Sequence, residues 1–120
     1  MLTAGEKIMV PQGWGNDSLS EFIEDAHQNT LATFANLKPE YTHLKNINDT
    51  FKKITDNLLN IDKLIPALIM LRSHASYLGA VRLAASGQIP ETYMVLRGCL
   101  ENSFYALHLA FVPDTIEIWI

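Results

Sequence analysis

The chain has 120 residues and a formal net charge of −4, and this length favours a single domain. Hydrophobic residues make up 48% of it and charged residues 18%, below the usual quarter, so we expect some apolar surface to face a partner chain. No Lys/Arg cluster is present, which excludes the electrostatic footprint of a duplex-DNA-binding protein and a basic membrane-surface helix.

The sequence predicts a soluble, cytoplasmic protein. The first ten residues carry Glu6 and Lys7 and lack the apolar core of a signal peptide. The apolar run over 64–71 is far shorter than the ~20 residues that span a bilayer. Cys99 is the single cysteine, so it has no partner for an intrachain disulfide, and its apolar surroundings favour a buried structural thiol.

The first sixteen residues have no hydrophobic period and predict an irregular N-terminal arm. Pro11, Gly13 and Gly15 interrupt any regular structure there. Met9 and Trp14 are too apolar to remain in solvent, so we expect the arm to lie across the bundle or across a neighbouring subunit.

Two helices are predicted in the first half of the chain. The first covers about 17–36, with Ser18 and Glu21 at capping-box spacing, and Pro39 ends it. The second begins near Pro39, a residue suited to the first helical turn, and must break within 62–66. Its apolar residues recur with three-four spacing: Leu44, Ile47, Phe51, Ile54, Leu58, Ile61 and Ile65.

Two further helices, over about 65–86 and 90–111, form the predicted centre of the fold. The third is rich in small residues, and Gly79 within it suggests close helix packing. Gly87 is placed as its C-terminal cap. The fourth is apolar on nearly every side, which predicts a helix enclosed by the others.

Together these elements predict an all-α fold, an up-and-down bundle of about four helices occupying 17–120 as one domain. The chain ends on Ile118-Trp119-Ile120, an apolar end that would be unusual if exposed. We therefore expect either that these residues are buried or that the chain is a fragment of a longer domain.

One polar stripe crosses the fourth helix and is the candidate ligand-binding site. Arg97, Glu101 and His108 lie at i, i+4 and i+11, close to one line on a helix. Tyr105 flanks the stripe, and Arg72 is available from the third helix. Two interpretations are open: a site for an anion or polar ligand between helices, or a buried ion pair that fixes helix register.

A metal site is not expected. Glu24 and His27, like Glu40 and His43, have the Glu-x-x-His spacing of di-iron bundles. The two pairs would nevertheless lie roughly 15–20 Å apart along antiparallel helices, against about 3.5–4 Å between the ions of one cluster. His74 is interpreted as a partly exposed helix residue. No nucleophile elbow and no glycine-rich phosphate loop is present, and no cofactor is expected.

The second half of the chain resembles a family of uncharacterised bacterial helical proteins similar to the HEPN group, the nucleotide-binding helical bundles of higher eukaryotes and prokaryotes. The motifs are Leu71-Arg72-Ser73-His74, Ala84-Ala85-Ser86-Gly87-Gln88, Leu96-Arg97-Gly98-Cys99-Leu100-Glu101, and Pro113-Asp114 followed by Trp119. Active HEPN proteins are ribonucleases with an Arg-x4–6-His motif at a dimer interface. No histidine follows Arg72, Arg82 or Arg97 at that distance. The resemblance therefore implies a helical fold and dimerisation.

The sequence thus predicts a helical-bundle protein that acts through oligomeric or ligand contacts rather than catalysis. We expect a homodimer, with a further protein partner possible. One alternative is a HEPN-like, RNA-directed protein of the ribonuclease-toxin or phage-defence type, although the acidic net charge gives RNA binding no support. The other is a small-anion-binding module built on the polar stripe.

Overall fold

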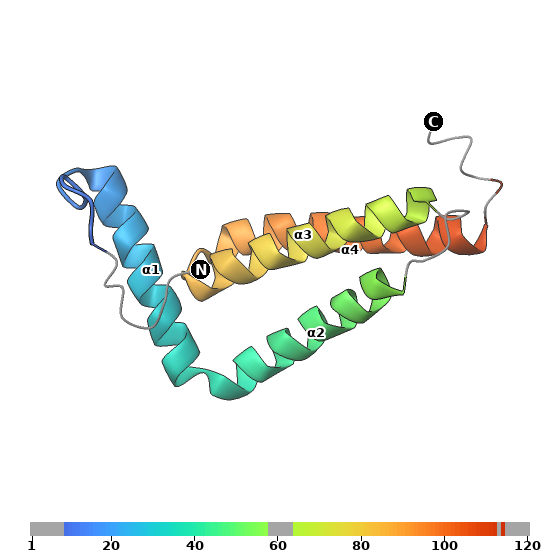
Figure 1. Cartoon of the computed structure of the whole chain (residues 1–120), viewed down its shortest axis with the longest axis horizontal. Helices are drawn as coiled ribbons and strands as arrows, with labels where there is room; N and C mark the ends of the chain where they lie inside the picture. The colour runs from blue at the N-terminus through green and yellow to red at the C-terminus, as the bar shows by residue number, and fades with distance from the viewer. Residues whose placement is uncertain (1–8, 58–63, 113, 115–120) are drawn as a thin grey trace.

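The computed structural model describes residues 9–57, 64–112 and 114, which form four helices and no strand. The helices are α1 (Ser18–Asn36), α2 (Lys38–Asp56), α3 (Leu64–Ala85) and α4 (Ile89–Phe111). They run in an up-and-down order, with α3 and α4 side by side and α2 along the same pair (Figure 1). The all-α bundle is therefore confirmed. The predictions made for Leu58, Ile61 and the apolar end of the chain lie outside the described residues.

The α3–α4 hairpin is closed by the turn that the sequence predicts. Gly87 has a φ of 88°, in the left-handed region where a side chain is strained. Its amide donates to the Ala84 carbonyl at 3.0 Å, and the Gln88 amide donates to the Leu83 carbonyl at 3.0 Å. These two bonds form a Schellman motif, which satisfies the last carbonyls of α3. Pro90 then occupies the first turn of α4, where its missing N–H costs nothing.

The core lies between α3 and α4, and its buried apolar residues are mostly small: Tyr77, Ala80, Cys99, Ala106 and Leu109. Gly79 lies in this contact, but a Cβ built there would meet its nearest neighbour, the Val95 Cγ1 atom, at 3.8 Å. That is an ordinary contact, so the predicted dependence of helix packing on Gly79 is wrong. Gly98 has nothing within 4 Å of a built Cβ. Neither helical glycine is required by packing.

We expect Gly98→Ala to raise the free energy of unfolding by about 0.5–1 kcal/mol, because alanine restricts the unfolded chain and fits the helix. Gly87→Ala is the matched control and should lower stability, because its φ of 88° strains any side chain. Urea unfolding followed by circular dichroism measures both changes. A destabilised Gly98→Ala variant would contradict the open space at that position.

Helix α2 is joined to α3 through one cluster of aromatic and polar side chains. The His74 ring stacks on Phe51 with 5.1 Å between centroids and shares a 2.8 Å hydrogen bond with the Asn48 side chain. The Tyr77 hydroxyl donates to the Leu44 carbonyl at 2.7 Å. Burial, together with nearby Cys99, raises the pKa of Tyr77 above its ordinary value of 10.0. This cluster fixes the position of α2 on the hairpin.

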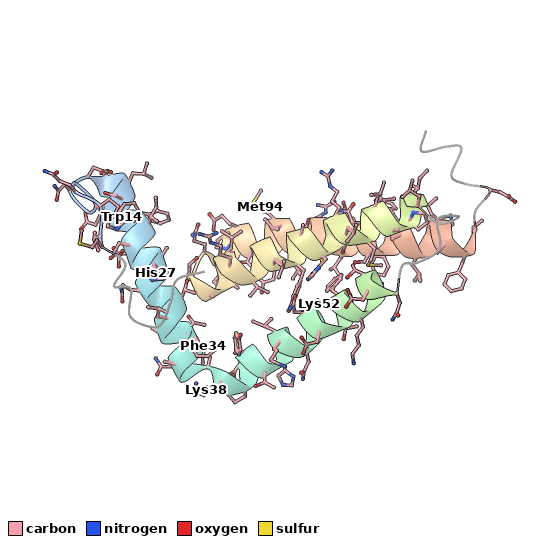
Figure 2. The ribbon with its side chains drawn as sticks, in the orientation of Figure 1. Trp14, His27, Phe34, Lys38, Lys52 and Met94 are labelled. Carbon is pink, nitrogen blue, oxygen red and sulfur yellow. The ribbon has the colours of Figure 1, made fainter. Side chains whose placement is uncertain are left out.

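Helix α1 diverges from the other three helices, and the molecule is correspondingly open (Figure 1). The α1–α2 corner is held by an edge-to-face contact of Phe34 with Tyr41, whose centroids are 4.7 Å apart, and by the Lys38 ammonium 4.6 Å from the Phe34 ring centre (Figure 2). The Thr33 hydroxyl donates to the Ala85 carbonyl at 2.8 Å. The radius of gyration is 18.4 Å, against about 14 Å for a compact domain of this length.

The N-terminal end of α1 is capped by Asp17, not by Ser18 as predicted. One Asp17 carboxylate oxygen accepts from the Leu19 and Ser20 amides at 3.0 and 2.9 Å. The Ser20 hydroxyl donates to the other oxygen at 2.7 Å. This hydroxyl bond, with the backbone bonds, holds the pKa of Asp17 below its ordinary value of 3.8. Aspartate and serine are about equally good N-caps, so the residue types alone do not show which of the two takes the position.

The described part of the arm folds onto α1, so the predicted position across the bundle is wrong, and the alternative position across a neighbouring subunit stays a prediction. The Gly15 amide donates to the Ser20 hydroxyl at 2.9 Å, and the Trp14 indole N–H donates to the Glu24 carboxylate at 3.0 Å. Met9, at 87% exposed, and Val10 contact little of the molecule. Residues 11–16 therefore extend the first turns of α1.

We expect Asp17→Ala to lower the unfolding midpoint at neutral pH, because two amides and one hydroxyl lose their acceptor. The pKa of Asp17 is lower in the folded than in the unfolded chain, so its stabilisation is complete above pH 3.8 and is lost as the pH falls below that value. The difference between wild type and variant should therefore shrink in acid. Asp17→Asn keeps a good cap and serves as control. Thermal melts from neutral pH to below pH 3.8 measure the unfolding midpoints of the wild type and both variants.

Helix α4 lies at the rim of the molecule, so its predicted central position is wrong. Cys99, Ala106 and Leu109 face α3 and are buried. On another side of the helix Met94, at 76% exposed, lies in solvent (Figure 2). Phe104 is also exposed. Apolar composition on every side predicts burial, but only α3 packs extensively against α4 within the described residues.

Helix α3 is long and apolar enough to cross a membrane, judged by length and composition alone. The core helix of a soluble protein passes the same test. Here α3 packs against α4 on one side and α2 on another, and it carries Arg72 and Arg82. A membrane-spanning role therefore has only weak support.

Candidate functional site

The polar stripe of α4 contains an ion pair, but at the surface. The Arg97 Nε atom donates to the Glu101 Oε1 atom at 2.9 Å, and the two side chains are 82% and 48% exposed. The expectation of a pair neutralised in the interior is therefore wrong, since this side of α4 has no neighbouring helix within the described residues. A solvated pair one turn apart contributes only about 0.3–0.5 kcal/mol.

The other predicted site residues are not gathered around this pair. Arg72 and His108 are exposed, and neither belongs to the ion pairs found among the described residues, Arg97–Glu101 and Lys45–Asp49. The Tyr105 ring, on the same side of α4, is 43% exposed. The structure thus pairs Arg97 with Glu101 and leaves Arg72 and His108 outside the ion pairs of the described residues. Ligand binding by these residues stays a prediction.

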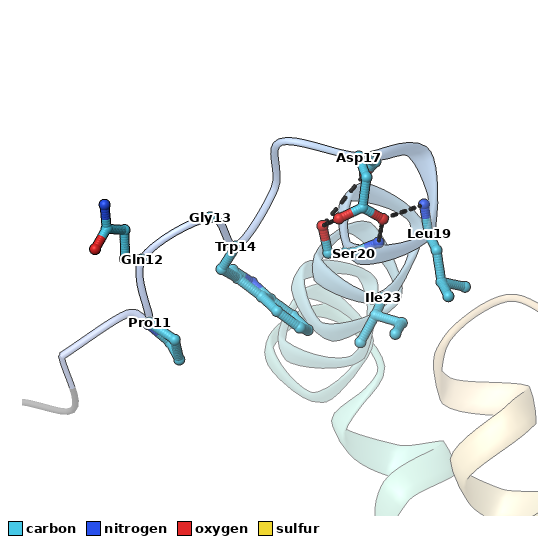
Figure 3. A pocket seen from close by; sticks show the side chains of 8 residues that line it. All are labelled: Pro11, Gln12, Gly13, Trp14, Asp17, Leu19, Ser20 and Ile23. Carbon is cyan, nitrogen blue, oxygen red and sulfur yellow. Dashed lines mark hydrogen bonds between the residues drawn. The ribbon is translucent and has the colours of Figure 1, made fainter.

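Two shallow hollows lie elsewhere. One, of about 140 Å³, lies on α2 and is lined by Ile47, Thr50, Phe51 and Ile54. The other, of about 320 Å³, lies where the arm meets α1 (Figure 3), and its lining residues are Pro11, Gln12, Gly13, Trp14, Asp17, Leu19, Ser20 and Ile23. The only acidic group of the second hollow is already engaged as the α1 cap. Neither hollow presents converging polar groups of the kind that orient a small ligand.

A buried cluster of two hydroxyls and one thiol lies at the centre of the α3–α4 contact. The Ser73 hydroxyl, fully buried, donates to the Cys99 carbonyl at 2.9 Å and lies 3.4 Å from the Cys99 Sγ atom. The Ser103 hydroxyl also donates to that carbonyl at 2.9 Å and contacts the Ser73 hydroxyl. The interactions run within the cluster and involve no base, so it joins two helices rather than forming a nucleophile. The prediction that Cys99 is buried is confirmed.

No group of three or more His, Cys, Asp or Glu side chains that could hold a metal occurs within 9–57, 64–112 and 114. Glu24, from one of the Glu-x-x-His pairs, accepts from the Gln28 side chain at 2.8 Å and from Trp14 at 3.0 Å. These two bonds lower the pKa of Glu24 below its ordinary value of 4.5. His74 is half-buried, which confirms that it is a partly exposed helix residue.

An apolar seam runs along the exposed side of α4, and sequence reasoning missed it. We call it the α4 seam; its residues are Ile89, Tyr93, Leu96, Leu100, Phe104, Leu107 and Phe111. Leu96 is half-buried and the other six are 49–79% exposed. The sequence signal that could have found the seam is the three-four spacing of its residues. This row is separate from the row of Cys99 and Ala106 that faces α3. Helix α3 exposes a smaller apolar face through Leu64, Leu68, Leu71 and Leu78.

No protein-family model, no curated protein and no solved structure matches the chain. The resemblance to the HEPN group therefore stays a prediction based on the motifs quoted above.

We expect Ser73→Ala to lower the free energy of unfolding by about 1 kcal/mol, because the Cys99 carbonyl loses one of its two hydroxyl donors. Ser73→Leu should cost about 1–3 kcal/mol, because there is no room for three added carbons at a fully buried position. Urea unfolding measures both. If Ser73→Leu were as stable as wild type, the α3–α4 contact would not be packed as described.

Proposed function

We propose that this protein is a cytoplasmic, non-catalytic helical-bundle protein that acts by self-association, with the homodimer as its working form. The observation that carries the proposal is the exposure of large apolar side chains along α4 and α3. Soluble monomers seldom expose a continuous apolar surface of more than a few hundred Å², and larger ones are typical of interaction sites.

The small core supports the same proposal. The buried apolar residues among those described are Pro66, Tyr77, Ala80, Cys99, Ala106 and Leu109, three of which, Ala80, Cys99 and Ala106, have small side chains. Burial of a large side chain contributes about 1.5–3 kcal/mol, so a core of this size leaves little margin over the entropy of ordering four helices. A partner chain that covers the exposed faces would supply the missing burial.

The two alternatives have less support. An RNA-directed, HEPN-like activity would require basic groups along a surface, whereas the chain carries a net charge of −4. A small-anion module would require a site of positive potential, whereas the Glu101 carboxylate lies 2.9 Å from the Arg97 Nε atom and would repel an anion there. The exposed apolar faces contribute to neither activity, and self-association makes use of them.

We expect light scattering coupled to gel filtration to give a mass near twice the 13.5 kDa of the chain, decreasing toward one chain on dilution. The physical reason is that buried apolar area, not a permanent covalent link, would hold the dimer together. A mass of one chain across roughly two decades of concentration would contradict the proposal.

Incubation with RNA in the absence of metal is the companion measurement. No cleavage is expected. Cleavage that disappears in Arg97→Ala, a variant that keeps the helical circular-dichroism spectrum, would instead favour the RNA-directed alternative.

A further inference from the structure

We propose that α4 pairs with α4 of a second copy in antiparallel orientation, about a two-fold axis that passes beside Leu100. This inference rests on the proposed self-association and adds the surface, the orientation and the register. Three properties of the α4 seam support it: the spacing of its residues along the sequence, its exposed area and the charges that flank it.

The first property is the symmetry of the spacing. Successive residues of the seam are separated by 4, 3, 4, 4, 3 and 4 positions along the sequence, so the series is the same in both directions about Leu100. In an antiparallel pair this places Ile89 opposite Phe111, Tyr93 opposite Leu107 and Leu100 opposite its own copy. Three-four spacing is the pattern that lets two helices interlock along their length. A two-fold interface requires the same patch on both chains, and this patch is self-complementary.

The second property is the exposed area. Six residues of the seam are 49–79% exposed in the single chain. At about 200 Å² for a large side chain, they offer on the order of 700 Å². Stable protein–protein interfaces bury about 800 Å² on each partner, so the seam with the stems of its flanking residues is of sufficient size. Phe104 and Phe111, at 66% and 79% exposed, are the large anchors expected at such an interface.

The third property is charge complementarity. Arg97 and Glu101 lie along the edge of the seam, on the side away from the buried row that contains Cys99 and Ala106. In the antiparallel pair centred on Leu100, Arg97 of one chain and Glu101 of the other lie on the same side of the interface. They differ by only ~3 Å in height at 1.5 Å per residue. The two-fold axis therefore brings opposite charges together twice. A parallel pair would instead place the charged edges of the two helices on opposite sides of the interface, where Arg97 and Glu101 of one chain do not meet those of the other.

The apolar face of α3 is the competing surface, and it fits a second copy less well. Its leucines are about half exposed, its centre is the small Ala75, and the same row continues to Arg82. It therefore offers less apolar area and no aromatic anchor. Leu71 and Leu78 of this face serve as control positions.

Two single-cysteine variants test the register in the full-length chain, both in a Cys99→Ala background. Leu100→Cys should form a disulfide-linked dimer on mild oxidation, because each copy meets the other at the axis. Leu107→Cys should not, because the two cysteines would lie roughly 20 Å apart along the antiparallel pair. Non-reducing gels measure the product, and circular dichroism establishes that each variant is helical.

The outcomes separate this inference from the proposed function. Cross-linking of both variants would show a parallel pair and overturn the inference. A dimeric mass with neither variant cross-linked, or a dimer disrupted by Leu78→Glu and not by Phe104→Glu, would place the interface elsewhere while leaving self-association intact. A monomeric wild type would overturn both.

A charge exchange gives a second, independent test. Arg97→Glu should weaken dimerisation at least tenfold, since it brings carboxylates together across the axis. The double variant Arg97→Glu/Glu101→Arg should restore most of the affinity. Sedimentation at several concentrations measures both. Equal weakening in the single and double variants would contradict the predicted contact between the chains.

Discussion

The contact between α3 and α4 is the interaction on which the rest of this structure depends. It contains most of the buried side chains, and its centre is hydrogen-bonded: two hydroxyls, from Ser73 and Ser103, converge on the Cys99 carbonyl. A backbone carbonyl inside a helix already accepts one bond, and its second lone pair is used here to join two helices. Because the Gly87 turn connects these helices directly, this contact joins two consecutive elements of the chain.

The other two helices are attached to this hairpin by far fewer interactions. Helix α2 depends on the cluster of Phe51, His74 and Tyr77, and α1 depends on its corner with α2 and on the hydrogen bond from Thr33 to Ala85. The result is an open bundle in which the seam of α4 has no covering helix within the described residues. The same openness that makes the single chain marginal gives it a surface for association.

The sequence predicts what depends on local chemistry. The all-α fold, the Gly87 cap, Pro90 in the first turn of α4 and the Arg97–Glu101 pair follow from residues within a few positions of one another. The α1 cap differed by one residue because Asp17 and Ser18 are both good caps, and only the local geometry selects between them.

The features that the sequence could not predict depend on how the helices are arranged around one another. Hydropathy does not distinguish an apolar side chain that is buried in its own chain from one that is free to contact another chain. The apolar composition of α4 therefore predicts a central helix, although the structure exposes much of it. The exposure of the Arg97–Glu101 pair follows from that same error. The bonds from His74 to Asn48 and from Tyr77 to the Leu44 carbonyl join residues 26 and 33 positions apart, and no spacing in a single sequence indicates them.

The single residue between α1 and α2 has a consequence for motion. Leu37 alone separates the two helices, and beyond this corner α1 has few links to the hairpin. A helix with few contacts can open while the rest of the molecule stays folded. We therefore expect the stability of α1 to follow a local opening equilibrium, and that of the hairpin to follow the cooperative unfolding of the whole chain. On the same grounds we expect α1, with residues 11–16 that fold onto it, to open at a lower free energy than the α3–α4 hairpin.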